Sequence, residues 1–189
     1  GLAEGESVAF TAIITDSSGN STTGTASGTT LAVDQTVPTI SSVNSTTLNG
    51  TYGIGKTVSI QIISTEDITV DVSGGTPTLT LETGSSDASV DYFSGSGSFV
   101  SSFIYTVLSG HTSPDLAYES TSALSLNGGS MNDIAGNPLT LTLITPGESN
   151  SLSANKNIII DAVAPSAFTV GAVSSTGNTV VSNYWNSTN

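Results

Sequence analysis

The chain contains no cysteine and no arginine, and it has only two lysines among its 189 residues. Without cysteine, disulfides and thiolate metal sites are excluded, so the fold depends on packing alone or on packing plus ions. Against the two basic residues stand 15 acidic ones, which gives a formal net charge of −13. Phosphate recognition needs Lys and Arg, so we exclude nucleic acid and anionic membranes as partners and expect cations instead.

Long apolar runs are also missing. No run reaches the ~18 residues that a membrane-spanning helix needs, so we expect no membrane insertion in this segment. The first ten residues, GLAEGESVAF, have neither a basic start nor a long apolar stretch, so we expect no signal peptide there. Helix-favouring runs of Ala, Leu, Glu, Lys and Arg are absent, and no amphipathic helix is predicted.

The chain instead holds many short segments in which Thr, Val, Leu and Ile alternate, a pattern typical of strands. Clusters of Gly, Pro, Asn and Asp separate these segments. Many short strands between turns predict an all-β fold, an antiparallel β-sandwich. The predicted strands are residues 8–14, 31–33, 57–62, 78–81, 103–107, 116–118, 139–143 and 157–160.

Two motifs occur twice and in the same order. D-x-x-G-N stands at residues 16–20 and again at 133–137, while D-x-x-x-P stands at 34–38 and again at 161–165. Such a repeat predicts modules in tandem. Because proline cannot continue a strand ladder, each D-x-x-x-P is expected to end one module and begin the next.

The repeat divides the chain into three parts. Residues 37–162 would form one complete module. Residues 1–36 would be the C-terminal part of a preceding module, and residues 163–189 the N-terminal part of a following one. We therefore expect the chain to be one part of a longer tandem array.

Six segments, taken in order, resemble a known family: VDQTVPTISSV, GTYGIGKTVSIQI, STEDITV, GTPTLTLETG, LNGGSMNDIAGN and NIIIDAVAP. They are similar to the bacterial immunoglobulin-like tandem repeats of giant extracellular adhesins and surface fibre proteins. The resemblance covers the whole chain and is clearest over residues 31–165. It implies immunoglobulin-like modules, a role in cell adhesion, a location outside the cell or on the bacterial surface, and calcium at module junctions.

One segment points elsewhere. GTYGIGKT, residues 50–57, fits the phosphate-binding pattern G-x-x-x-x-G-K-[ST], and residues 158–161 look like a strand ending in a magnesium-binding aspartate. That site needs a buried strand before the loop and a helix after it. Here polar residues precede Gly50, and the residues after Lys56 alternate with period two. We therefore predict a glycine-shaped turn leading into a strand, and no nucleotide binding.

Signals for catalysis are sparse, and we expect no enzyme. The only histidine, His111, lies in a polar loop and is predicted to be exposed there without a catalytic role. Neither G-x-S-x-G nor H-E-x-x-H occurs. Aromatic residues make up only 6% of the chain, too few for a typical glycosidase cleft, and Tyr184 and Trp185 are predicted to be core residues.

The sandwich topology predicts where acidic residues meet. The linker, the loop expected after the strand at 57–62, and the second D-x-x-G-N turn should all lie at one end of the complete module. Calcium takes six to eight oxygen ligands, and no basic residue competes for them. The predicted calcium site consists of Asp34, Glu66, Asp67, Asp133 and Asn137, the last contributing a carbonyl oxygen.

By the same repeat, Asp16 and Asn20 would face a preceding module and Asp161 a following one. The alternative is that D-x-x-G-N is an ordinary tight turn, in which Asp and Asn bind their own backbone and no metal is needed. Other acids, such as Asp87, are interpreted as solvated loop charges.

Three functions remain open. The first is a non-enzymatic structural repeat of a long adhesin or fibre, whose partners are the neighbouring immunoglobulin-like modules. The second is a carbohydrate- or protein-binding module that uses loops such as 84–98 to bind a host or cell-surface receptor. The third is a subunit of an extracellular filament that is completed by strand exchange between chains.

Overall fold

The computed structural model describes residues 2–8, 11–25 and 31–168. These residues form strands joined by turns, with a single four-residue helix, α1 (Leu152–Asn155). The all-β prediction is therefore confirmed at the level of fold class. Among the described residues, no helix has the length and apolar character needed to cross a membrane.

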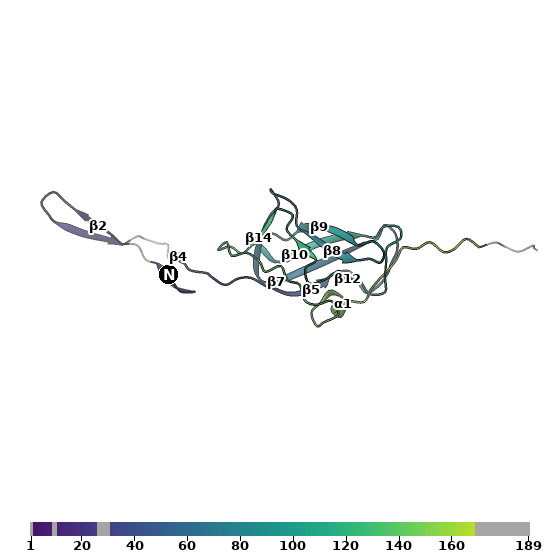
Figure 1. Cartoon of the computed structure of the whole chain (residues 1–189). Coiled ribbons are helices and arrows are strands. Elements are labelled where there is room, and N and C mark those ends of the chain that lie inside the picture. The colour runs from purple at the N-terminus through teal and green to yellow at the C-terminus, as the bar shows by residue number, and fades with distance from the viewer. Residues whose placement is uncertain (1, 9–10, 26–30, 169–189) are drawn as a thin grey trace, which may run out of the picture.

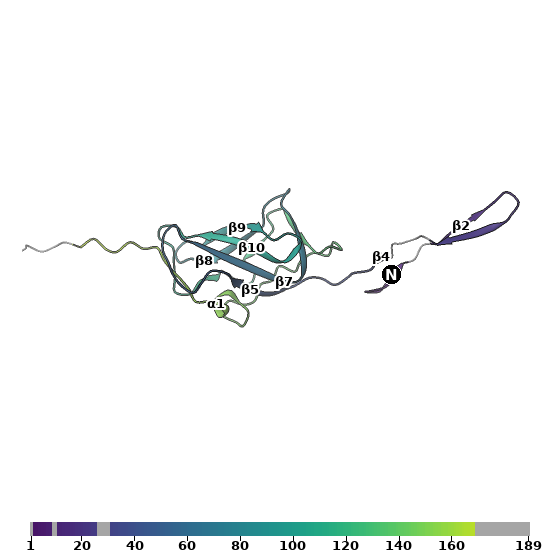
Figure 2. The same ribbon diagram turned by 180° about the vertical axis from the view of Figure 1, so that it is seen from behind.

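The N-terminal region holds four strands. β1 (Ser7–Val8) pairs with β4 (Leu31–Ala32), and β2 (Thr11–Thr15) forms an antiparallel hairpin with β3 (Ser21–Thr25). Figures 1 and 2 show the hairpin standing apart from the main body of the chain. Every residue of β2 is exposed, so neither face of this hairpin is covered by the described residues.

The main body contains one large sheet of eight strands. Its strands follow the order β12-β8-β9-β10-β7-β14, with β13 also on β8 and β5 also on β7. Their bounds are β5 (Ile40–Ser45), β7 (Thr57–Asp71), β8 (Thr78–Glu82), β9 (Ala88–Ser94), β10 (Ser98–Thr106), β12 (Ala117–Tyr118), β13 (Leu124–Ser125) and β14 (Ser130–Asn132).

A small second sheet has the order β11-β15-β6, with β6 (Gly50–Tyr52), β11 (Thr112–Ser113) and β15 (Ile158–Asp161). β15 runs parallel to β6, whereas every other strand pair of the described residues is antiparallel. The prediction of a purely antiparallel fold is wrong at this pair. About a hundred residues separate β6 from β15, so no hairpin dictates their direction.

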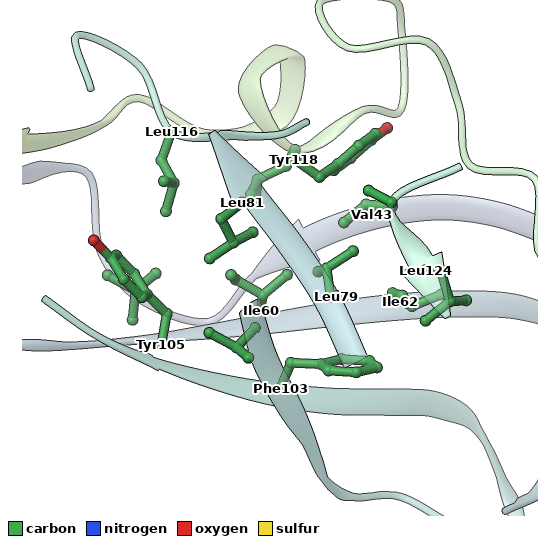
Figure 3. Close-up of a cluster of buried hydrophobic side chains, with 14 of the residues drawn as sticks. Val43, Ile60, Ile62, Leu79, Leu81, Phe103, Tyr105, Leu116, Tyr118 and Leu124 are labelled. Atoms are coloured by element: carbon green, nitrogen blue, oxygen red, sulfur yellow. The ribbon is translucent and has the colours of Figure 1, made fainter. Parts of the chain in front are cut away.

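Period-two alternation builds the core, as predicted. In β7, Ile60 and Ile62 are buried, and they face the side chains of Leu79 and Leu81 on β8 (Figure 3). Phe103 on β10 closes the same cluster. All buried members of this hydrophobic cluster lie between Ile40 and Ala162, within the segment predicted as the complete module.

β7 is longer than the sequence indicated. The loop predicted after residues 57–62, which would hold Glu66 and Asp67, does not form. The strand continues to Asp71 because its far half pairs with β14, where Met131 lies opposite Val70. The pairing of β7 with β10 shifts register between Ser98 and Val100. The extra residues bulge at this point and increase the local twist. Glu66 and Asp67 therefore lie in an irregular part of a strand.

The strand predicted at 139–143 does not form. Leu139 and Leu143 are buried, as the alternation predicted, but the backbone of this segment has no single partner strand. Its N–H groups reach three separate carbonyls: Leu139 donates to Met131, Thr140 to Pro38 and Leu143 to Thr121. A β-ladder needs one neighbouring strand along its length. Next to this segment the structure has only an isolated bridge, between Asn132 and Pro138.

The GTYGIGKT segment forms strand β6 and then a turn in which Gly55 has φ +78°. Strand β7 follows directly, so the helix that a phosphate-binding loop requires is missing from this place. The predicted turn before a strand is confirmed.

Candidate metal centre

Three of the predicted acidic residues meet at one end of the main body. Asp34, Glu66 and Asp133 each contribute a carboxylate oxygen, and these oxygens lie within 4.8 Å of one another. Asp34 and Glu66 are half-buried and Asp133 is buried. Among the described residues, this is the one group of three or more acidic, histidine or cysteine side chains placed to share a metal ion.

Each residue comes from a different element. Asp34 follows β4 in the linker, where its Oδ1 accepts a hydrogen bond from the Thr36 backbone N–H at 3.1 Å. Glu66 lies in the irregular part of β7, and Asp133 follows the end of β14. Segments that are distant in sequence are thus joined only by the tertiary fold.

The turn after β14 is held by its own side chains. Asp133 Oδ1 accepts from the Asn137 backbone N–H at 2.8 Å, and Oδ2 accepts from Asn137 Nδ2 at 2.8 Å. Gly136 has φ +95°, a left-handed conformation that glycine adopts without strain. The local hydrogen bonds are those of the tight-turn interpretation.

Asn137 also reaches the linker, because its Nδ2 donates to the Asp34 carbonyl at 3.2 Å. The amide nitrogen, and not the predicted carbonyl oxygen, is the atom directed at these acidic residues. Asn137 therefore joins the linker to the turn and positions Asp34 beside Asp133.

The electrostatics of the cluster are uneven. Burial raises the pKa of Glu66, and the neighbouring charges of Asp34, Asp133 and Glu4 raise it further. Burial also acts to raise the pKa of Asp133, but hydrogen bonds from Asn137, Gly136 and Ala135 outweigh it and the pKa is lowered. Asp133 is thus stabilised as a carboxylate, whereas the charged form of Glu66 is disfavoured by burial and by the neighbouring acids.

Two predicted residues lie outside the cluster. Asp67 is exposed, and although it follows Glu66 directly in β7, it does not belong to the group of three carboxylates. Asp161 is exposed at the end of β15, and its Oδ1 accepts from the Val163 backbone N–H at 3.3 Å. Asp34 likewise accepts a hydrogen bond from the backbone N–H two residues later, that of Thr36, so both D-x-x-x-P motifs start with the same hydrogen bond.

The first D-x-x-G-N turn repeats the second almost bond for bond. Asp16 Oδ1 accepts from the Asn20 backbone N–H at 2.9 Å, and Oδ2 accepts from Asn20 Nδ2 at 3.0 Å. Gly19 has φ +87°. The Asn20 side chain is the largest cause of a lowered pKa at Asp16. Both residues are exposed at the tip of the β2–β3 hairpin, and among the described residues Asp16 belongs to no group of three or more side chains placed to share a metal ion.

Glu4 is a neighbour that the motifs did not reveal. Its carboxylate accepts a hydrogen bond from the Gln35 backbone N–H, beside Asp34, and its charge contributes to the raised pKa of Glu66. Glu4 belongs to no repeated pattern in the sequence. The pairing of β1 with β4 and the backbone hydrogen bonds of Gly5 and Glu6 to Val33 bring it to the linker.

The prediction that His111 is exposed is wrong. The ring is buried with 9% exposure, and it stacks on Tyr105 at 5.8 Å between ring centroids. The Tyr105 hydroxyl and His111 Nδ1 lie 2.8 Å apart. The Leu108 backbone N–H lies 3.5 Å from the same nitrogen and donates to it, so Nδ1 is the acceptor and the Tyr105 hydroxyl is the donor. Burial raises the pKa of Tyr105 to about 12. Tyr184 and Trp185, predicted as core residues, lie outside the described residues.

Comparisons of the chain with protein-family models, with curated proteins and with solved structures found no match.

Proposed function

We propose that the chain is a non-enzymatic structural segment of a long secreted or surface-anchored adhesin or fibre. In this proposal immunoglobulin-like β-sandwich modules follow one another in tandem, and calcium stiffens each junction. The function is reach and stiffness. The partners are the neighbouring modules of the same polypeptide or fibre, outside the cell or on a bacterial surface.

The observation that carries the proposal is the repeated pair of turn and linker. The turns at 16–20 and 133–137 share their side-chain and backbone hydrogen bonds. Asp34 and Asp161 share the bond to the second N–H after them. A tandem array requires such equivalence, because each linker must meet the same turn in the module that follows it.

Asn137 provides the link between the two repeated parts. Its bond to the Asp34 carbonyl connects the turn of one module to the linker that precedes it. By repetition, the turn at 16–20 would hold a preceding linker, and Asp161 would meet the turn of a following module. The exposure of both Asp16 and Asp161 agrees with partners that lie beyond the described residues.

Calcium fits the acidic cluster on physical grounds. Three carboxylates from three elements have oxygens within 4.8 Å of one another. Burial raises the pKa of Glu66, the neighbouring acids raise it further, and a bound cation would offset that repulsion. Hard cations prefer carboxylate oxygens, and calcium accepts irregular sets completed by backbone and water. A bound ion would tie the linker to β7 and to the 133–137 turn, so the junction would bend less.

Thermal melting in calcium and in chelator tests this proposal. Extracellular calcium sites typically have Kd values of ~10⁻⁴ to 10⁻³ M. At ten times Kd, binding should stabilise the folded body by about 1.4 kcal/mol and raise Tm. Asp34→Asn should remove most of the rise while keeping the turn bond to Thr36. Asp87→Asn, an exposed acid elsewhere, should leave the rise intact.

Solution scattering tests the stiffness separately. In calcium the particle should be longer and straighter than in chelator, and Asp34→Asn should abolish the difference. If neither Tm nor shape responds to roughly 5–10 mM calcium, which exceeds the weak end of the Kd range, calcium at this junction is refuted. If flanking sequence lacks further D-x-x-G-N and D-x-x-x-P pairs, the tandem array is refuted.

A filament subunit completed by strand exchange is the second candidate, and the β2–β3 hairpin favours it. Ile13 and Ile14 are 68% and 71% exposed on a hairpin of two strands. An isolated hairpin is only marginally stable in water, so a further strand or a packed surface would stabilise these two strands. Sedimentation that shows concentration-dependent polymers, lost in Ile13→Ser, would favour the filament. A monomer at every concentration would rule it out.

A further inference from the structure

The cleft between β9 and β10 is a second candidate site, distant in sequence from the linker. The two strands are neighbours, yet their pairing is limited to Ser102 with Ser94 and Phe103 with Tyr92. Beyond these pairs each strand continues with a partner on one edge only, β8 for β9 and β7 for β10. A cleft of about 520 Å³ opens there, lined by residues 86–93, 104–106, 108 and 111.

One wall of the cleft combines an aromatic ring with acids. Along β9, Val90 is buried and Tyr92 packs against the core, so Asp91 and Phe93 point to the outer face. Phe93 is 69% exposed, a large apolar surface left to water. Asp87 lies on the same wall and is exposed.

Two further lining residues add an apolar contact and a hydrogen-bond donor. Leu108 lines the cleft and is 58% exposed. His111 lines it as well, and its Nδ1 accepts from the Tyr105 hydroxyl and lies 3.5 Å from the Leu108 backbone N–H. With Nδ1 used as an acceptor, a neutral ring carries its proton on Nε2. That N–H has no partner among the described residues and is free to donate to a ligand.

The charges of the residues that line the cleft limit the kinds of ligand that can bind there. No lysine or arginine lines the cleft, so phosphate, sulfate and carboxylate ligands would meet only repulsion from Asp87 and Asp91. A purely apolar ligand would leave both carboxylates without hydrogen-bond donors. A ligand with one apolar face and many hydroxyl donors satisfies the ring and the acids together.

We infer that this cleft binds a saccharide, either neutral or amine-bearing. Phe93 would stack on the apolar face of a pyranose ring, Asp87 and Asp91 would accept from its hydroxyl or amine groups, and His111 Nε2 would donate. The volume lies within the ~300–1,000 Å³ of small-molecule sites and suits a mono- or disaccharide. The inference goes beyond the structural role and does not depend on it.

Titration of the isotope-labelled chain, followed by NMR, tests the inference. The probes are glucose, galactose, N-acetylglucosamine and glucosamine, with glucuronate as the anionic control. At least one of the four should shift the amides of residues 86–93 and 104–108 with a Kd of about 1 mM. Glucuronate should shift none of them.

Substitutions provide the matched control. Phe93→Ala should weaken binding about tenfold or more, because the aromatic platform is lost, and Asp91→Asn should weaken it less. Phe99→Ala removes another exposed phenylalanine, 53% exposed on β10 outside the cleft, and should change nothing. An unchanged Tm in each variant verifies that the fold is kept.

Three outcomes overturn the inference. The first is no shift in these residues with any of the four sugars at about 50 mM, well above the expected Kd. The second is equal loss of binding in Phe93→Ala and Phe99→Ala. The third is an extended cationic peptide that shifts these residues when the sugars do not, which would make the cleft a peptide groove along the open strand edges.

Discussion

The turns at 16–20 and 133–137 have the same motif and the same hydrogen bonds, but they lie in different surroundings. Asp16 is exposed at the tip of a hairpin, whereas Asp133 is only 4% exposed and lies beside Asp34 and Glu66. The motif alone is thus sufficient for the turn. Whether the turn takes part in a metal site depends on what the rest of the chain places next to it.

The same contrast separates the hairpin from the main body. β2 and β3 pair along their length, yet every side chain of β2 is exposed, while β7 buries alternate residues against β8 and β10. Strand pairing without a covered face contributes little stability. The body should therefore unfold as the stable unit, and the hairpin should contribute little to its melting.

Two substitutions, one in the core and one in the hairpin, test this difference between the body and the hairpin, and the core substitution should have the larger effect. Leu79→Ala removes a fully buried side chain from the core and should lower the free energy of unfolding by about 2–5 kcal/mol. Ile13→Ala on the hairpin should change it by less than about 0.5 kcal/mol. Chemical denaturation measures both. An equal loss in the two variants would mean that the hairpin folds cooperatively with the body.

Alanine substitutions at the glycines of the two turns compare the turns directly, with a smaller expected change in stability. Gly136 and Gly19 have φ of +95° and +87°, and an added Cβ would meet nothing within 4 Å at either position. The cost of alanine is then conformational only, about 1–2 kcal/mol. Gly136→Ala should lower the stability of the body by this amount, and Gly19→Ala should leave it unchanged. A similar loss from Gly19→Ala would place the first turn within the cooperative unit.

A third prediction is a loss of stability with rising pH that comes from Glu66, beside the second turn, and has no counterpart at the first turn, where only a lowered pKa at Asp16 is found. In chelator, the raised pKa of Glu66 means that the folded state holds this proton more tightly than the unfolded chain. Stability should therefore fall as pH rises from the ordinary glutamate value of 4.5 through the raised one. Asp133 acts with the opposite sign at lower pH, because its lowered pKa makes stability fall as pH falls through it.

Melting curves across this range, in chelator, measure the slope. Glu66→Gln should flatten it, and saturating calcium should flatten it in the unsubstituted chain, because a bound cation relieves the repulsion. Asp16→Asn should leave it unchanged. A slope that persists in Glu66→Gln would show that another group is responsible.

Elements with a local signal were predictable from the residues alone. Alternation located β7, β8, β10, β12 and β15, and the D-x-x-G-N motif located both turns. The acidic cluster was predictable in part, since the order of strands along the chain placed Asp34, Glu66 and Asp133 at one end. Local propensity and side-chain pattern suffice here because alternation marks the buried face of a strand, and because each D-x-x-G-N turn is closed by hydrogen bonds among its own residues.

Other features of the molecule follow from contacts that no sequence pattern predicted. β7 continues through Glu66 because β14 pairs with it, residues 139–143 form no strand because their partners differ, and His111 is buried because Tyr105 stacks on it. The same holds for Glu4 beside the linker, for the amide nitrogen of Asn137 on Asp34, and for the cleft where β9 leaves β10. Tyr105 and His111 are six residues apart, and β9 and β10 are adjacent in the chain. The other features depend on contacts between residues far apart in the chain, and a local pattern carries no information on such contacts.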